Sequence, residues 1–488
     1  MTGQYSMKKK INLVWLKRDI RTLDHQPLAD ACQSTLPFFV FYLFEPNLIS
    51  CRYTSQRHLG FIGQSLQDLT RHIPNNSLHI GQQNIIEFLL KVSQQYTINT
   101  LFCHQETGLS WSYQRDLAVV AFCQSHHINL TAYANGAVVR GLKTRSLWKN
   151  KRQNELQQPI ITAKFNRANW FNVNQLNLAT FTPPNSWLDN ESFQAGGETK
   201  ALHCLEDFLN NRAACYVSSI SSPELSQTFC SRLSAHLAYG NISIKYCFQK
   251  AKASNFTLLN NNRNAFISRL KWRCHFIQKL ETSPEIEFVP INPAYRDFIY
   301  TKGPLGRYRL RAWQRGMTGF PFVDACMRML NQTGYLNFRM RAMLVSFLCH
   351  YLDLDWRWGL RHLAKVFLDF EPGIHISQFQ MQAGVTGINT LRIYNPIKQG
   401  LEQDPEALFI QKWVPELASL PATCRHQPWQ TKPMENIFYQ FELGKTYPQP
   451  IVCPDTRYRL ARDKHWHFKN LSSVKQHKPH IIKQHVAR

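Results

Sequence analysis

The first 135 residues alternate short apolar runs with helical patterns, and this alternation restricts the possible folds more than any other feature of the sequence. The apolar runs are residues 11–16, 37–43, 101–103 and 130–133. Between them, apolar residues such as Leu59, Ile62 and Leu66 recur at helical spacing. Continuously apolar strands separated by helices are typical of a parallel sheet covered on both faces. The sequence therefore predicts a doubly wound parallel-sheet α/β domain over residues 1–135.

A long connection follows this domain. Residues 136–198 contain Pro159, Pro183, Pro184 and a Gly196–Gly197 pair within a largely polar stretch, which predicts an interdomain linker. The α/β domain itself lacks a G-x-G-x-x-G fingerprint after its first strand, where the sequence reads WLKRDIRTLDHQPLADA.

From residue 199 onward the apolar spacing is helical, which predicts an all-helical domain over residues 199–456. A Ser222–Pro223 start, apolar residues every four positions and Gly240 at the end predict one helix over residues 222–240. A second helix carries an apolar face made of Met340, Leu344, Phe347 and Tyr351. Residues 457–488 hold nine Lys or Arg against one Asp, which predicts a basic C-terminal tail, either an arm or a solvated helix.

Charge and cysteine content narrow the class of protein further. The chain has 57 Lys and Arg against 32 Asp and Glu, a formal net charge of +25 that favours polyanionic partners. The longest apolar stretch, residues 36–44, is too short to span a bilayer, and the N-terminus lacks the pattern of a secretory signal. Thirteen cysteines without a C-x-x-C pair predict reduced thiols. We therefore expect a cytoplasmic protein with no membrane contact.

Three segments combine Trp, Arg, Ser and carboxylates in a way that a plain core does not require. They are CSRLSAHLAYG (230–240), FISRLKWRCHF (266–276) and the stretch from AWQRGMTGFPFVDACMRMLNQTG through DWRWG to LRIYNP (312–396). With the N-terminal LVWLKRDIRTLDHQPLADA, they make nearly the whole chain resemble the DNA photolyase and cryptochrome family. The resemblance implies an α/β antenna domain followed by an all-helical domain that holds FAD. It also allows a second antenna chromophore of unknown identity.

The resemblance implies a set of residues that hold FAD. Ser231, Arg232 and Ser234 lie near a helix start, where hydroxyls, backbone N–H groups and a guanidinium can hold a pyrophosphate, although the same pattern also occurs in simple capping. At position 230 the family usually has Thr, and this chain has Cys. The full implied set is Tyr216, Cys230, Ser231, Arg232, Leu233, Ser234, Arg341, Asp369, Phe370, Glu371 and His375.

Two members of this set have specific implied roles. Arg341 and Asp369 match an ion pair beneath the flavin ring, which can equally be a structural salt bridge. His375 falls at the position facing flavin N5 and can donate a hydrogen bond or a proton, the alternative being an ordinary helix-terminus histidine.

The family reduces its flavin through a relay of tryptophans. Trp313 and Trp356 match the outer and middle members, but the flavin-proximal position holds Phe379, and a phenyl ring is a poor electron donor. Trp358, Tyr394 or Trp272 would then have to take its place.

The implied DNA-contacting residues depart from those of cyclobutane-dimer photolyases. Trp272 matches an aromatic that stacks on a flipped base, and Arg273 matches a phosphate or flavin-side contact. The lesion pocket differs, because Arg269 replaces a Glu, Phe338 replaces an Asn and is followed by Arg339, and Met381 replaces a Trp.

These observations predict a light-driven deoxyribodipyrimidine photo-lyase, in which reduced FAD passes an electron to a pyrimidine dimer in DNA. We expect a monomer that binds DNA containing such dimers. No metal is expected, because His465, His467 and the cysteines lack a four-ligand spacing. The alternatives are a cryptochrome-type blue-light photoreceptor without repair activity and a passive binder of single-stranded nucleic acid.

Overall fold

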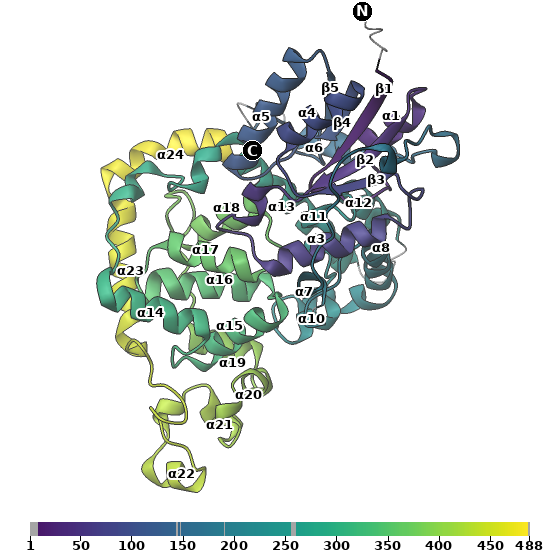
Figure 1. Ribbon diagram of the computed structural model, residues 1–488. Coiled ribbons are helices and arrows are strands. Elements are labelled where there is room, and N and C mark those ends of the chain that lie inside the picture. The colour runs from purple at the N-terminus through teal and green to yellow at the C-terminus, as the bar shows by residue number, and fades with distance from the viewer. Residues whose placement is uncertain (1–7, 143–144, 147, 190, 255–259, 487–488) are drawn as a thin grey trace, which may run out of the picture.

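The computed structural model describes residues 8–142, 145–146, 148–189, 191–254 and 260–486, so the expectations for the two chain ends lie partly outside it. An α/β domain and a larger helical domain lie side by side, and the last two helices run along the outer edge of the helical domain (Figure 1).

The α/β domain is built on one five-stranded sheet. Its strands are β1 (Lys10–Leu16), β2 (Phe38–Leu43), β3 (Leu78–Gly81), β4 (Thr97–His104) and β5 (Asn129–Tyr133). Their order is β3-β2-β1-β4-β5, and all neighbours are parallel, with Val14 of β1 opposite both Val40 and Phe102. The predicted doubly wound sheet is confirmed. The apolar pattern does not predict β3, because its four residues, LHIG, form too short an apolar run.

Helices cover both faces of this sheet. They are α1 (Gln26–Gln33), α2 (Pro46–Ile49), α3 (Gln56–Leu69), α4 (Ile85–Gln95) and α5 (Ser110–Ser125). Side chains of α1 and α3 pack with Val14 and Val40, whereas side chains of α4 and α5 pack with Leu13 and Phe39. The strand order reverses between β1 and β4, so the loops after these strands diverge and leave a crevice at the carboxyl ends.

In its described residues, the segment from residue 136 to residue 198 forms only short elements and packs against both domains, with Trp148 and Leu156 in the core of the helical domain and Trp170 and Trp187 against the α/β domain. It contains α6 (Trp148–Gln157), η1 (Phe165–Arg167), η2 (Val173–Gln175) and α7 (Asn185–Leu188). The backbone N–H of Phe38 donates to the Asn169 carbonyl at 3.0 Å, and the Phe38 carbonyl accepts from Phe171 at 2.8 Å. A Cβ on Gly60 would lie 1.9 Å from the Trp187 carbonyl oxygen, so the linker requires glycine at this contact.

In the described ranges from residue 198 to residue 486, all regular elements are helical, as predicted. In chain order they are α8 (Glu198–Asp207), η3 (Phe208–Arg212), η4 (Ala213–Cys215), α9 (Tyr216–Ser219), α10 (Leu225–Phe229), α11 (Ser234–Tyr239), α12 (Ile244–Ala253), α13 (Asn260–Thr282), η5 (Pro284–Glu287), η6 (Pro293–Asp297), α14 (Gly303–Arg315), α15 (Pro321–Thr333), α16 (Phe338–Ser346), η7 (Phe347–Tyr351), α17 (Trp356–Val366), α18 (Pro372–Gln382), α19 (Pro396–Gln403), α20 (Leu408–Trp413), η8 (Pro415–Leu417), α21 (Ala422–Arg425), η9 (Pro428–Gln430), α22 (Pro433–Phe438), α23 (Pro454–Asn470) and α24 (Ser472–His485).

The prediction of a single helix over residues 222–240 is wrong. The chain forms α10 and α11, and between them Arg232 has a φ of 57°, in the left-handed region that a helix cannot contain. Gly240 ends α11 at a φ of 73°, as predicted. The predicted apolar face from Met340 to Tyr351 is confirmed, because all four of its residues are buried along α16 and η7.

The basic C-terminal residues form α23 and α24, which dock on the helical domain. Lys464 forms an ion pair with Asp353 at 2.7 Å, and Arg457 donates to the Tyr351 carbonyl. His465, Val474 and His485 are buried, so these helices have one packed face instead of being solvated all round. Within the described ranges no helix is both long and apolar enough to cross a membrane. All thirteen cysteines lie in the described part of the chain and are unpaired, and eight of them are buried.

Asp324 of α15 holds the turn that precedes its helix. Its carboxylate accepts hydrogen bonds from the backbone N–H groups of Thr318 at 2.9 Å and Gly319 at 3.1 Å, from the Thr318 hydroxyl at 2.7 Å and from the Tyr447 hydroxyl. Burial raises the pKa of Asp324 to about 6 in spite of these bonds.

We expect Asp324→Asn to lower the melting temperature, because an amide leaves at least one buried N–H without an acceptor, at a cost of about 1–3 kcal/mol. Tyr447→Phe removes one donor and should lower the melting temperature less. Since the folded-state pKa lies above the ordinary value of 3.8, ionisation of Asp324 opposes folding, and its contribution to wild-type stability falls as the pH rises from about 4 to about 7. Thermal unfolding of the three proteins at pH 5 and pH 8 checks this. Equal melting temperatures of wild type and Asp324→Asn would contradict it.

Candidate functional site

The loop between α10 and α11 has the backbone geometry of an anion-binding turn. Arg232 is left-handed, with a φ of 57°, and Leu233 is right-handed, with a φ of −85°, a combination that turns successive N–H groups toward one point. Arg212 donates to the Cys230 carbonyl, and the Cys204 thiol donates to the Ser231 carbonyl at 3.0 Å. The loop carbonyls are therefore engaged by the protein, and the Leu233 N–H makes only a long hydrogen bond of 3.5 Å to the Ser231 hydroxyl, which a phosphate can replace.

An ion pair joins this loop to the core of the helical domain. Arg341 of α16 donates two hydrogen bonds to Asp369, at 2.9 and 2.7 Å, and the Ser234 hydroxyl bonds to the same carboxylate. Burial raises the pKa of Asp369, but Arg341 and Ser234 more than offset this effect, so the net pKa lies below the ordinary value. The carboxylate stays ionised, and it joins three separate segments, those of Ser234, Arg341 and Asp369, through its hydrogen bonds.

Tyr335 and Cys230 shape the neighbouring part of the loop. The Arg232 guanidinium lies 3.6 Å from the ring centroid of Tyr335, whose hydroxyl donates to the Ser226 carbonyl at 3.1 Å. Cys230 hydrogen-bonds the same tyrosine through its thiol, and burial raises the pKa of this thiol to about 11. Cys230 is thus a neutral packing residue at the position where the family has a hydroxyl.

Glu371 connects the helical domain to the α/β domain. Its Oε2 atom lies 3.3 Å from Arg273 and 3.4 Å from Arg18, while its Oε1 atom is buried without a partner. Arg18 also donates to the carbonyls of Ala238 and Phe370, both at 2.9 Å. Arg273 donates to the Leu237 carbonyl at 2.8 Å and faces this interior, so its predicted DNA-phosphate contact is not supported and its flavin-side alternative agrees with the geometry.

His375 and Phe370 lie next to this carboxylate segment. The Nε2 atom of His375 lies 3.0 Å from the Leu360 carbonyl, which can only accept, so Nε2 carries the proton. Burial lowers the pKa of His375 to about 4, and the ring is neutral at pH 7 with Nδ1 as an acceptor. The Phe370 ring packs against His375 and Tyr53, at centroid distances of 5.4 and 5.6 Å.

These residues fit a flavin dinucleotide. The Arg232–Leu233 turn supplies N–H groups for a pyrophosphate, and the unpartnered Oε1 atom of Glu371 supplies a buried acceptor that a ligand N–H or hydroxyl can satisfy. The Arg341–Asp369 pair supplies a fixed charge distribution beside them.

The predicted electron relay is arranged differently from the expectation. Trp313 is 0% exposed, and it lies with Phe379 at Gly359, where an added Cβ would be 3.3 Å from the Trp313 ring and 3.0 Å from the Phe379 ring. An outer member must reach solvent, so Trp313 cannot be the outer end of a relay. It is an inner neighbour of Phe379. Trp356 is buried at the start of α17, and Trp358 is only partly buried.

Apart from Arg273, the predicted DNA-contacting residues lie at or near the surface beside this site. Trp272 of α13 is 47% exposed and Phe338 of α16 is 44% exposed, whereas Met381 is partly exposed. Arg269 hydrogen-bonds Tyr216, which is buried, and Arg339 donates to the Ser221 hydroxyl at 3.0 Å. The segment from Tyr216 to Ser221 therefore bridges both surface helices and brings predicted cofactor and DNA residues together.

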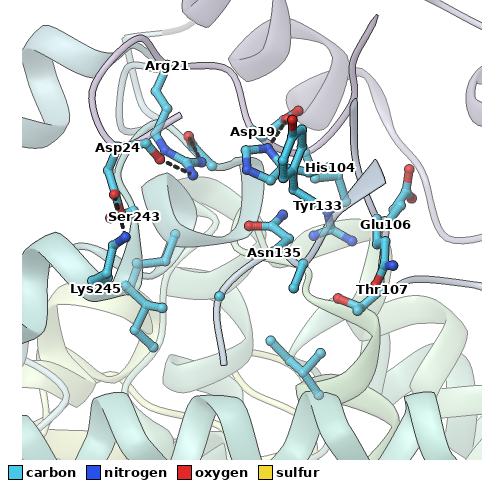
Figure 2. A pocket seen from close by; sticks show the side chains of 18 of the residues that line it. Asp19, Arg21, Asp24, His104, Glu106, Thr107, Tyr133, Asn135, Ser243 and Lys245 are labelled. Carbon is cyan, nitrogen blue, oxygen red and sulfur yellow. Dashed lines mark hydrogen bonds and ion pairs between the residues drawn. The ribbon is translucent and has the colours of Figure 1, made fainter. Parts of the chain in front are cut away.

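A polar cavity of about 230 Å³ lies at the carboxyl ends of the strands, and the sequence analysis did not find it. Asp24, Ser243 and Lys245 occupy one side, and Glu106 and Thr107 occupy the other (Figure 2). Lys245 forms an ion pair with Asp24 at 2.8 Å. The cavity could have been predicted from the positions of polar residues, because they follow the first and fourth strands, where the strand order reverses. Glu371 and Arg273 also line this cavity, so it adjoins the site above.

One carboxylate at this cavity lies between two histidines. Asp19 Oδ2 lies 2.7 Å from His104 Nδ1 and 3.0 Å from His25 Nε2. His25 Nδ1 accepts from the Leu28 N–H, so its Nε2 carries a proton and donates to Asp19. Asp19 is thus a hydrogen-bonded carboxylate with its pKa well below the ordinary value. Asp19, His25 and His104 bring three possible metal ligands together, but in this arrangement the Nε2 atom of His25 carries a proton and is not available to a metal.

Two family models match the chain. The family model for the FAD binding domain of DNA photolyase matches residues 266–467, and the DNA photolyase model matches residues 12–147, together more than half of the chain. The chain belongs to the DNA photolyase and cryptochrome family.

Two relatives span almost its whole length. A cryptochrome DASH of Synechocystis sp. is 26% identical over 90% of this chain and 94% of its own length. A deoxyribodipyrimidine photo-lyase of Vibrio cholerae is 27% identical over 89% of this chain and 96% of its own length.

Two solved structures share the fold. The Synechocystis cryptochrome has a TM-score of 0.84 at 24% identity and covers 94% of this chain and 99% of its own. An archaeal photolyase from Sulfolobus tokodaii, described with two FAD molecules, has a TM-score of 0.76 at 24% identity and covers 94% of this chain and 100% of its own.

Asp369→Asn should release the flavin and destabilise the protein, because it leaves Arg341 without its counter-charge at a cost of about 3 kcal/mol. Flavin absorbance per chain and the melting temperature measure the two effects. Asp463→Asn breaks a surface pair with Arg462 and serves as the control that should change neither. Full flavin content in Asp369→Asn would contradict the role given to the pair.

Proposed function

We propose that the protein is a light-driven deoxyribodipyrimidine photo-lyase that binds DNA and splits pyrimidine dimers, acting as a monomer in the cytoplasm. The observation that carries this proposal is the bridge from the flavin site to the surface: Tyr216 bonds Arg269, one helical turn from the exposed Trp272. The unpaired thiols support a reducing compartment.

Bound FAD in its reduced form supplies a light-excited electron for dimer cleavage. The residues of this chain do the rest: the Arg232 turn binds the pyrophosphate, the Arg341–Asp369 pair orients the ring system, and His375 offers a neutral acceptor next to it. Buried aromatic side chains such as Phe370 and Phe379 exclude water from this interior.

The surface residues support a nucleic-acid substrate. Trp272 and Phe338 offer two aromatic faces for stacking, and Arg269 and Arg339 supply cations on the same helices. The formal net charge of +25 supplies the general electrostatic attraction to DNA.

A photoreceptor without repair activity is the second candidate, and one observation favours it. Arg269, Phe338 and Met381 stand where dimer photolyases carry Glu, Asn and Trp, so the lesion pocket has a different lining. Against it, the basic C-terminal helices that would signal are docked through Lys464 and Asp353. The match to an FAD-binding domain argues against a passive binder of single-stranded nucleic acid.

The cavity at the sheet is the site we propose for a second, light-harvesting chromophore. It offers Lys245, Glu106 and Asn135 to polar ring substituents and adjoins Glu371 of the flavin site, and the Sulfolobus tokodaii photolyase holds two FAD molecules. Lys245→Met should remove a second chromophore from the denatured extract and leave the FAD in place. Loss of both, or of neither, would contradict this assignment.

Binding to DNA should be strongly salt-dependent and should prefer dimer-containing DNA. Affinity should fall by about 10³-fold between 50 and 200 mM salt if at least six phosphates are contacted. Trp272→Ala should remove the preference for damaged DNA at a cost of about 1–3 kcal/mol and leave binding to undamaged DNA nearly unchanged. Trp466→Ala, an exposed tryptophan on α23, is the matched control. Equal losses on both DNAs would count against the assignment.

Phe379→Trp should speed photoreduction of the flavin, because an indole is oxidised more easily than a phenyl ring and Trp313 lies next to this position. Turnover of chemically pre-reduced enzyme should stay the same, since repair starts from reduced flavin. Transient absorption measures the first effect, and dimer loss measures the second. If wild type already photoreduces as fast as Phe379→Trp, Phe379 does not interrupt the relay.

A further inference from the structure

Two buried cationic side chains, Arg145 and Lys279, lie without a counter-charge among the described residues where the linker, α13 and α24 meet. Beside them lies His485, whose pKa is lowered by burial to about 3, so that its ring is neutral at pH 7. Arg145 is 1% exposed, Lys279 is 5% exposed and His485 is 2% exposed. Helix α24, at the yellow end of the chain in Figure 1, packs against α13. Burying unpaired charges is strongly unfavourable, so a protein retains them where a ligand of opposite charge completes the site.

The geometry places these groups along one face of α13. His275, Lys279 and Ser283 follow each other at intervals of four along α13 and its C-terminal end, so they share one face. Arg145 donates to the His275 carbonyl at 3.3 Å, at one end of this row. His485 lies 3.5 Å from the Ser283 hydroxyl, at the other end. Lys279 therefore lies between Arg145 and His485.

The unsatisfied atoms in this group are almost all donors. Nε and Nη1 of Arg145, Nε of Arg152 and Nε1 of Trp148 are buried without hydrogen-bond partners, as is Nδ1 of His485. Both guanidinium groups pack on the Trp148 ring, with the Cζ atoms of Arg145 and Arg152 at 4.7 and 4.8 Å from its centroid. A set of donors without acceptors is complementary to an oxyanion.

No carboxylate in the described part of these elements neutralises the group. Glu281 of α13 is paired with Arg140 at 2.9 Å, and Glu155 of α6 interacts with Lys245. Cys274 supplies no negative charge, because burial raises the pKa of its thiol. Burial and Arg145 together lower the pKa of Lys279 to about 8, as expected for an ammonium without a partner.

We propose that Arg145, Lys279 and His485, supported by Arg152 and Trp148, form a buried binding site for a small oxyanion of the phosphate class. Guanidinium and ammonium groups that lack a counter-charge bind a phosphate group, either as free phosphate or as the monoester of a small nucleotide. A DNA backbone cannot reach side chains that are this deeply buried. The bound anion joins α24 to the linker. His275, whose ring centroid lies 5.3 Å from that of Trp272, connects this site to the predicted DNA-contacting surface.

Thermal unfolding of the full-length, flavin-loaded protein tests this site. At pH 7 and constant ionic strength, replacing chloride with inorganic phosphate should raise the wild-type melting temperature by about 3 °C or more, in a saturable manner. Lys279→Met and Arg145→Gln should abolish the rise. In chloride alone, Lys279→Met should melt no lower than wild type, because it removes an uncompensated buried charge. Lys252→Met on the exposed side of α12 is the control that should retain the full rise.

Parallel titrations with AMP and adenosine distinguish free phosphate from a nucleotide monoester, since adenosine should have no effect. The proposal is overturned if phosphate has no saturable effect on wild type, or if it acts equally on wild type and Arg145→Gln. It is also overturned if a short oligonucleotide, and not phosphate or AMP, produces the Lys279-dependent rise. If Lys279→Met fails to fold, the phosphate titrations of Arg145→Gln and of wild type still test the proposed site.

Discussion

The ion pair between Arg341 and Asp369 is the interaction on which the site depends. Its carboxylate is shared by α16, by the Ser234 end of the anion-binding turn and by the segment that leads to Glu371 and His375. A complete buried ion pair adds little to the free energy of unfolding, but removal of one partner is strongly destabilising. The pair therefore fixes the relative positions of these segments more than it stabilises the fold. A flavin dinucleotide can then bind to a site that is already formed.

The second constraint is the contact between the two domains. Arg18, in the loop after β1, reaches across to two carbonyls and to Glu371 of the helical domain. Because this loop lies where the strand order reverses, the same residues line the polar cavity of the α/β domain. One set of charged residues therefore lies between the proposed antenna site and the flavin site.

Much of this architecture could be predicted from the sequence, because continuous apolar runs indicate buried strands and apolar residues four positions apart indicate the buried face of a helix. Strand β3 could not be predicted, because a run of four residues is too short to recognise. The break at Arg232 could not be predicted, because the spacing of apolar residues does not reveal a left-handed backbone conformation. Trp272 and Arg273 were grouped together, although neighbours on a helix point about 100° apart and Arg273 faces Glu371. The burial of Trp313 and the group around Lys279 depend on tertiary packing, which no local pattern contains.

The central claim is that light absorbed by this flavoprotein splits pyrimidine dimers in DNA. The most direct measurement is the number of dimers remaining in an oligonucleotide after incubation with pre-reduced, flavin-loaded protein, in blue light and in darkness. The account predicts loss of dimers in light, more than one per protein molecule, and none in darkness. Protein that binds this DNA and carries reduced FAD, yet leaves the dimers intact under illumination, would contradict the account.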